Sequence, residues 1–165
     1  MTLRILVFGV LFVSSIILQS TLFHYLKIAG VKPDLLLVIV ILYSILKGEK
    51  HGARLGFVFG LLEDLLVGRY IGLQALTKMT VGYTIGLLER KVYQDNIIIP
   101  AGAAFAGTVL HGILCFIILF LTGSYTLNSI NFLPLTAAAA FYNMLIALII
   151  RGRFFYSNRQ GLLRT

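Results

Sequence analysis

The stretch Gly52–Lys78, GARLGFVFGLLEDLLVGRYIGLQALTK, carries the decisive pattern of this chain, because charged residues stand inside its apolar runs. Glycine recurs at every fourth position from Gly52, and Glu63, Asp64 and Lys78 follow among aliphatic neighbours. A helix face made of glycine lets another helix backbone approach closely. The stretch therefore predicts two closely packed helices, joined by a short turn, with charges at their contact.

The composition of the whole chain assigns it to the membrane. Hydrophobic residues make up 59% of the 165 residues and charged residues only 12%, and the mean hydropathy is +0.95. A globule of this size cannot hide so much apolar surface from water. The longest polar segments are short loops and a tail, which leave no room for a soluble domain. We therefore expect a single polytopic membrane domain over residues 1–165.

Six apolar segments approach the length of about 20 residues that a helix needs to cross the hydrocarbon core. They predict an all-α bundle of six transmembrane helices, with spans at 5–22, 35–46, 52–67, 71–88, 97–121 and 132–150 and a basic tail at 151–165. Glycine and charge interrupt the second to fourth spans, so a re-entrant segment is an alternative to full crossings there. Four helices would then cross the membrane.

Basic residues gather on one side of this predicted topology. Ten of the fourteen lysines and arginines belong to the side that holds both termini, namely Arg4, Lys47, Lys50, Arg54, Arg90, Lys91, Arg151, Arg153, Arg159 and Arg164. Since Lys and Arg in short loops favour the cytoplasm, both termini are expected there. The net charge of +8 then reflects topology and anionic lipids at the basic tail. Nucleic-acid binding is not indicated, because no basic patch alternates with exposed aromatic residues.

The glycine pattern extends beyond one span. The small-residue positions are Gly48, Gly52, Gly56 and Gly60, with Asp64 on the next step, and Gly82 and Gly86 in the following span. Helices in lipid associate through close packing rather than through hydrophobicity, so such a ridge indicates a helix contact. Two interpretations follow: packing within one bundle, or contact with another subunit, including a second copy of the chain. Ala137 to Ala140 offers a further small-residue face in the last span.

The charges of the stretch predict an intramembrane polar pair. Side chains lean toward the N-terminus of their own helix, so Asp64 and Lys78 on antiparallel spans converge. A Lys78–Glu63 pair is the variant, although Glu63 lies about 100° away and is expected nearer Arg69 or the outer interface. Asp34 is expected to start the second span at its outer end. A structural pair, a partner or ligand contact, and a proton or ion relay are the three explanations for these charges.

No catalytic, metal-binding or cofactor-binding residue is predicted. The single Cys115 excludes an internal disulfide and any CxxC site, and His24, His51 and His111 are too scattered for a metal site. The adjacent carboxylates point about 100° apart, and no nucleophile accompanies them. His111 and Asn143 are expected to form hydrogen bonds within the bundle. The sequence thus indicates a chain that is not an enzyme.

Three motifs follow one another in a specific order. They are Lys32-Pro33-Asp34 opening a leucine-rich span, the ridge from Gly52 to Gly60 that leads to Glu63-Asp64, and Gly72-Leu-Gln-Ala-Leu76 before Val81-Gly82-Tyr83. In this order they resemble the MreD family of rod shape-determining proteins, over essentially the whole chain, although the last two spans match only in hydropathy. Asp64 and Pro33-Asp34 fall on the aspartate and proline–aspartate positions of that family. Leu65 to Tyr70 departs from the small or polar residues that often follow there.

The resemblance implies a non-enzymatic subunit of the bacterial cell-elongation complex in the inner membrane. Such a subunit would bind MreC and help couple MreB filaments to the RodA glycosyltransferase and its penicillin-binding transpeptidase, and so regulate cell shape and lateral peptidoglycan synthesis. The family is also similar in architecture to the S-component of energy-coupling-factor transporters. The alternative function is therefore a substrate-binding subunit of a vitamin-type transporter. The loop 122–131 argues against it, because it offers only Ser, Thr, Tyr and Asn as polar groups.

Overall fold

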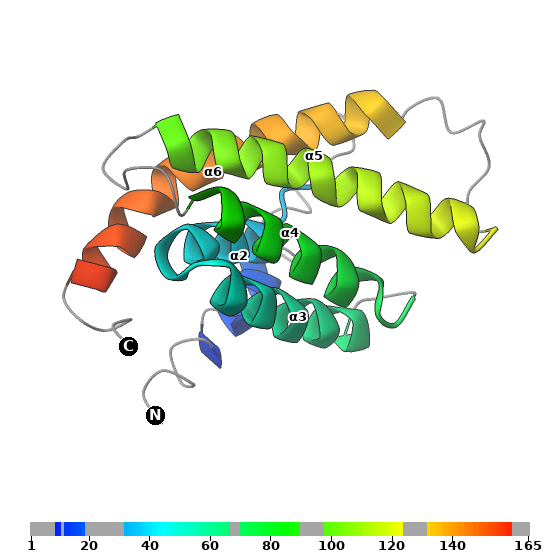
Figure 1. Cartoon of the computed structure of the whole chain (residues 1–165), viewed down its shortest axis with the longest axis horizontal. Coiled ribbons are helices and arrows are strands. Elements are labelled where there is room, and N and C mark those ends of the chain that lie inside the picture. Colours follow the sequence, from blue (N-terminus) through cyan, green and yellow to red (C-terminus); the bar gives the residue numbers. More distant parts are fainter. Residues whose placement is uncertain are drawn as a thin grey trace.

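The computed structural model of the chain describes residues 9–10, 12–18, 32–66, 70–89, 98–123 and 132–159. Five labelled helices fill most of these ranges (Figure 1): α2 (Leu35–Lys47), α3 (Glu49–Leu66), α4 (Leu73–Glu89), α5 (Ile98–Leu121) and α6 (Phe132–Arg159). Residues 9–10 and 12–18 are also helical, within the first predicted span. Within the described ranges there is no strand, and the all-α prediction is confirmed.

Helix α2 is short because both of its ends are capped. Asp34 accepts a hydrogen bond from the Leu37 amide at its start, and the Gly48 amide donates to the Ser44 carbonyl at its end. Gly48 has a φ of 83°, a left-handed conformation that glycine adopts without strain. This glycine therefore forms the α2–α3 turn instead of extending the packing ridge. Thirteen residues span about 20 Å, less than the hydrocarbon core.

Helix α2 lies at the centre of the bundle. It contacts α3, α4, α5 and α6, and nearly all of its side chains are buried, as an aliphatic run without a polar face predicts. Helices α3 and α4 form an antiparallel hairpin, and α4 lies between α3 and α5 (Figure 1). Phe59 of α3 and Val81 of α4 complete the apolar core around α2.

Helices α5 and α6 form the longest pair. Gly112 of α5 faces Thr136 of α6, and the rings of Phe116 and Phe132 lie 4.7 Å apart between centroids. Residues Ile98–Leu121 and Phe132–Ile150 are long and apolar enough to cross a membrane, while α2 is apolar but shorter. The count of six crossings stays a prediction.

The bounds of several elements differ from the predicted spans. Helix α3 begins at Glu49, ahead of the expected residue 52, because Gly48 ends α2 and the next residue already starts a new helix. Helix α6 continues to Arg159, into the predicted basic tail, because no proline interrupts it after residue 150 and Gly152 keeps the helical conformation. Four of the ten basic residues used to predict the topology, Arg4, Arg90, Lys91 and Arg164, lie outside the described residues.

Candidate functional site

The glycines of α3 lie against the backbone of α4. A Cβ atom added to Gly56 would come within 2.7 Å of the Lys78 carbonyl carbon, and one added to Gly60 within 2.5 Å of the Gln74 carbonyl carbon. Real Cβ atoms essentially never approach other atoms closer than 3.0 Å. Both positions therefore require glycine for the helices to lie this close.

The glycines of α4 likewise lie against the backbone of α3. A Cβ on Gly82 would lie 2.5 Å from the Gly52 carbonyl oxygen, and a Cβ on Gly52 would lie 2.7 Å from the Gly82 carbonyl oxygen. Gly86 meets Glu49 in the same way, at 2.5 Å from its Cα atom. The two glycine ridges thus interlock inside the bundle. Of the two interpretations of the glycine pattern, this is packing within one bundle. Gly52, Gly56 and Gly60 are buried there and are not exposed to another subunit.

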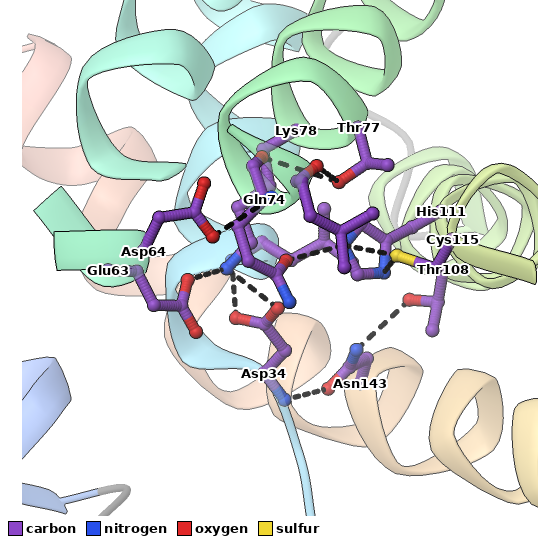
Figure 2. Close-up of polar contacts among 12 residues, drawn as sticks. Asp34, Glu63, Asp64, Gln74, Thr77, Lys78, Thr108, His111, Cys115 and Asn143 are labelled. Carbon is purple, nitrogen blue, oxygen red and sulfur yellow. Dashed lines mark hydrogen bonds and ion pairs between the residues drawn. The ribbon is translucent and has the colours of Figure 1, made fainter. Parts of the chain in front are cut away.

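Lys78 is the centre of a buried charged group, which we call the Lys78 cluster: Asp34, Glu63 and Lys78. The Lys78 side chain is 0% exposed, and its Nζ atom lies 2.8 Å from Oδ2 of Asp34. The same atom donates a hydrogen bond to Oε2 of Glu63. Figure 2 shows the lysine from α4 pointing between carboxylates from the start of α2 and the end of α3. The cluster joins three helices through one ammonium group.

The Asp34 segment connects this cluster to the long helices. The Asp34 amide donates to Oδ1 of Asn143 on α6, at 2.9 Å. The amide nitrogen of Asn143 donates to the Thr108 hydroxyl on α5, at 3.0 Å, and that hydroxyl donates to the Ala104 carbonyl. Non-helical backbone inside a membrane protein needs such internal partners for its polar groups. Asn143 therefore supplies the hydrogen bond that the start of α2 cannot obtain from its own helix.

Asp64 has a different position from the one expected. Its carboxylate accepts hydrogen bonds from three backbone amides at the start of α4: Gly72 at 2.9 Å, and Gln74 and Ala75 at 3.1 Å each. The first amides of a helix lack partners within the helix, and an anion there is further favoured by the helix dipole. Asp64 thus caps α4 across the hairpin (Figure 2).

The prediction that Asp64 pairs with Lys78 is therefore wrong, and Glu63 forms that pair instead. Asp64 lies on the glycine face of α3, and this face is turned toward the free backbone amides at the start of α4. Glu63 lies beside the glycine face, and its side chain, which is one methylene longer, reaches Lys78. The expectation that Glu63 extends toward the outer interface is wrong for the same reason, because its carboxylate meets a buried lysine. Arg69, its other expected neighbour, lies outside the described residues.

A second group of polar side chains borders the cluster on α5. The Nε2 atom of His111 lies 2.9 Å from Oε1 of Gln74, to which it donates in the tautomer that carries the proton there. The Cys115 sulfur lies 3.7 Å from the same His111 nitrogen. His111 therefore forms the bundle hydrogen bond that the sequence predicted. Among the described residues, no group of three or more His, Cys, Asp or Glu could hold a metal ion.

A shallow groove lies beside the α3–α4 turn. Its volume is about 270 Å³, and it lies between the start of α4 and the end of α5. It is lined by Tyr70, Ile71, Gly72, Leu73, Leu76, Ile118, Leu119 and Thr122. Most of this lining is apolar, so the groove offers contact area rather than directed hydrogen bonds.

Sequence reasoning found most members of the site and offered the Lys78–Glu63 pair as its variant, but it missed the contact of Lys78 with Asp34. Asp34 was recognisable as a helix cap, because aspartate before an apolar run is a common N-cap signal. Its contact with Lys78 joins residues 44 positions apart, and no local signal indicates it. The role of Asn143 likewise depends on a partner at a sequence separation of 109.

A family model identifies the family of this chain. No curated protein and no solved structure matches the chain. The family model described as rod shape-determining protein MreD matches residues 1–156. Because this match covers nearly all of the 165 residues, the chain belongs to the MreD family, membrane proteins of the bacterial rod shape-determining system.

Proposed function

We propose that this chain is a non-enzymatic, multi-pass subunit of the bacterial inner membrane that binds MreC and helps regulate lateral peptidoglycan synthesis. Family membership supports a role in rod shape determination. The observation that supports MreC binding is that the buried polar side chains bind partners inside the bundle and leave apolar side chains on its outer faces. Lys78, Asp64 and Asn143 are at most 2% exposed and bind partners inside the bundle, and many large side chains on the outer faces of the described helices are apolar and exposed.

The outer face of α6 is the proposed MreC contact. Leu133, Phe141, Leu145 and Ile149 follow one another at intervals of four or eight residues, with exposed fractions between 46% and 79%. Ala137 lies on the same face and is also exposed. A small residue between large ones lets a single transmembrane helix approach closely and pack by dispersion.

The wider assembly follows from this contact. MreC bound at the membrane would connect the chain to MreB filaments on the cytoplasmic side, and to RodA and its penicillin-binding transpeptidase. In this arrangement both termini are cytoplasmic, and the basic end of α6 meets anionic lipid headgroups. The groove beside the α3–α4 turn does not favour the vitamin-transporter alternative, because such a substrate needs convergent polar groups.

Co-purification with a matched pair of variants tests the proposal. Ala137→Trp on α6 should remove MreC from the chain purified out of native membranes in mild detergent, and rod shape should be lost. Ala106→Trp is the control, because this alanine is exposed in α5, the other membrane-capable helix. Loss of MreC only in Ala106→Trp would contradict the α6 assignment. Absence of MreC from the parent preparation would contradict MreC binding itself.

A further inference from the structure

The outer face of α3 begins with two basic side chains. Lys50 and Arg54 are both exposed and are four residues apart, so they lie on one face of the helix with Cβ atoms about 5–6 Å apart. At about 100° per residue, this face is nearly opposite the glycines that pack on α4. Two like charges at this spacing repel each other, and an anion bound between them offsets that repulsion. The pair therefore favours an anionic ligand.

The acidic residues of α3 do not lie on this exposed face. Glu49 is buried, and its backbone lies against Gly86 of α4. Glu63 and Asp64 are near the other end of the helix, where they bind Lys78 and the first amides of α4. Within α3, the outer face thus presents positive charge at its start.

The basic pair lies beside the turn between α2 and α3, at one end of these two helices. Lys78 contacts Asp34 at the start of α2 and Glu63 near the end of α3, so the two helices run in opposite directions. The turn at Gly48 is therefore at the end remote from the Lys78 cluster. Long basic side chains near a helix end in a membrane extend to the lipid headgroups. In the orientation proposed above, these headgroups belong to the cytoplasmic leaflet.

Apolar side chains continue the same face beyond Arg54. They are the exposed Phe57, Val58 and Leu65, with the partly buried Leu61 between them. The stretch from Arg54 to Leu65 is about 17 Å long at 1.5 Å per residue, and one leaflet contributes about 15 Å of hydrocarbon. The face therefore matches a single phospholipid in both polarity and length.

We propose that the outer face of α3 binds one anionic phospholipid, with its phosphate held by Lys50 and Arg54 and an acyl chain along the apolar part. The guanidinium of Arg54 offers paired N–H donors that match the oxygens of a phosphate, and the Lys50 ammonium adds a second charge. A phosphatidylglycerol headgroup has this chemistry, whereas phosphatidylcholine carries its own cation beside the phosphate. The site involves neither the basic end of α6 nor the α6 face proposed for MreC.

Thermal unfolding and native mass spectrometry of the full chain in mild detergent test this site. Dioleoylphosphatidylglycerol should raise the melting temperature of the parent and remain bound in the mass spectrum, because a ligand of the folded state stabilises that state. Dioleoylphosphatidylcholine at the same concentration should do neither. Because both leaflets are absent in detergent, the result does not depend on the proposed orientation or on MreC.

A matched pair of variants separates the site from the net charge of the chain. Arg54→Gln should weaken phosphatidylglycerol binding about fivefold, since one basic residue at an anionic surface contributes about 1 kcal/mol. Lys32→Gln is the control, because Lys32 is also exposed but precedes α2, at the other end of the helix pair. Without lipid, Arg54→Gln should unfold at the parent's temperature or slightly above it, because the repulsion from Lys50 is gone.

Three results would overturn the proposal. The first is equal binding of phosphatidylcholine and phosphatidylglycerol, or an equal loss of binding in Lys32→Gln and Arg54→Gln, because net charge or bulk lipid would then explain the effect. The second is an equal rise in melting temperature with inorganic phosphate, which would assign the pair to a free anion. The third is an acidic protein that is lost from Arg54→Gln preparations while lipid binding is unchanged.

Discussion

Replacement of Gly56 by alanine tests whether the glycine interlock determines the distance between α3 and α4. The added Cβ would lie 2.7 Å from the Lys78 carbonyl carbon, whereas ordinary van der Waals contact begins at 3.4 Å. The helices must therefore separate by at least about 0.7 Å at this point, which is the difference between these two distances, because the Lys78 carbonyl oxygen lies closer still. Overpacking of this kind costs about 1–3 kcal/mol, and the displaced backbone belongs to Lys78 itself, so the cluster is disturbed as well.

A matched alanine on α5 isolates this effect. Gly102 is also in a helix, but a Cβ added there meets nothing within 4 Å, so Gly102→Ala should be neutral or stabilising by up to about 1 kcal/mol through helix propensity. Thermal unfolding of both variants in the same detergent measures the difference. If Gly56→Ala unfolds at the same temperature as Gly102→Ala or above it, the close approach of α3 and α4 does not depend on glycine, and the reasoning fails.

Substitutions at Asp64, Lys78 and Asp34 test the polar contacts. Asp64→Ala removes the cap of α4 and should lower the free energy of unfolding by about 0.5–2 kcal/mol. Asp64→Asn should lower it less, because the amide oxygen still accepts hydrogen bonds from the α4 amides. Equal unfolding temperatures for the parent and Asp64→Ala would show that the three amides need no carboxylate. Lys78→Met leaves the buried Asp34 charge without its partner and should cost about 3–5 kcal/mol, and a second change, Asp34→Asn, should recover part of it by removing that charge. A double variant no more stable than Lys78→Met, measured by the same unfolding assay, would contradict the ion pair as the cause.

Several features of the fold were readable from local pattern because their causes are local. Apolar runs of sufficient length form helices in lipid, so α5 and α6 were expected almost at their observed starts. The four-residue spacing of Gly52, Gly56 and Gly60 indicated a helix contact, because small residues on one face leave room for a backbone. Asp34 before a leucine run indicated the start of α2. Each signal lies within a few residues of the structure that it predicts.

The pairing of the charges depended on tertiary structure. Glu63 and Asp64 are adjacent, and both were within reach of Lys78 by depth in the membrane. The rotation of α3 about its axis decides between them, and that rotation is set by the glycine interlock with α4. It turns Asp64 toward the free amides of α4 and leaves Glu63 for the lysine. A rotation of about 100° separates the two outcomes, and only packing across the bundle determines it.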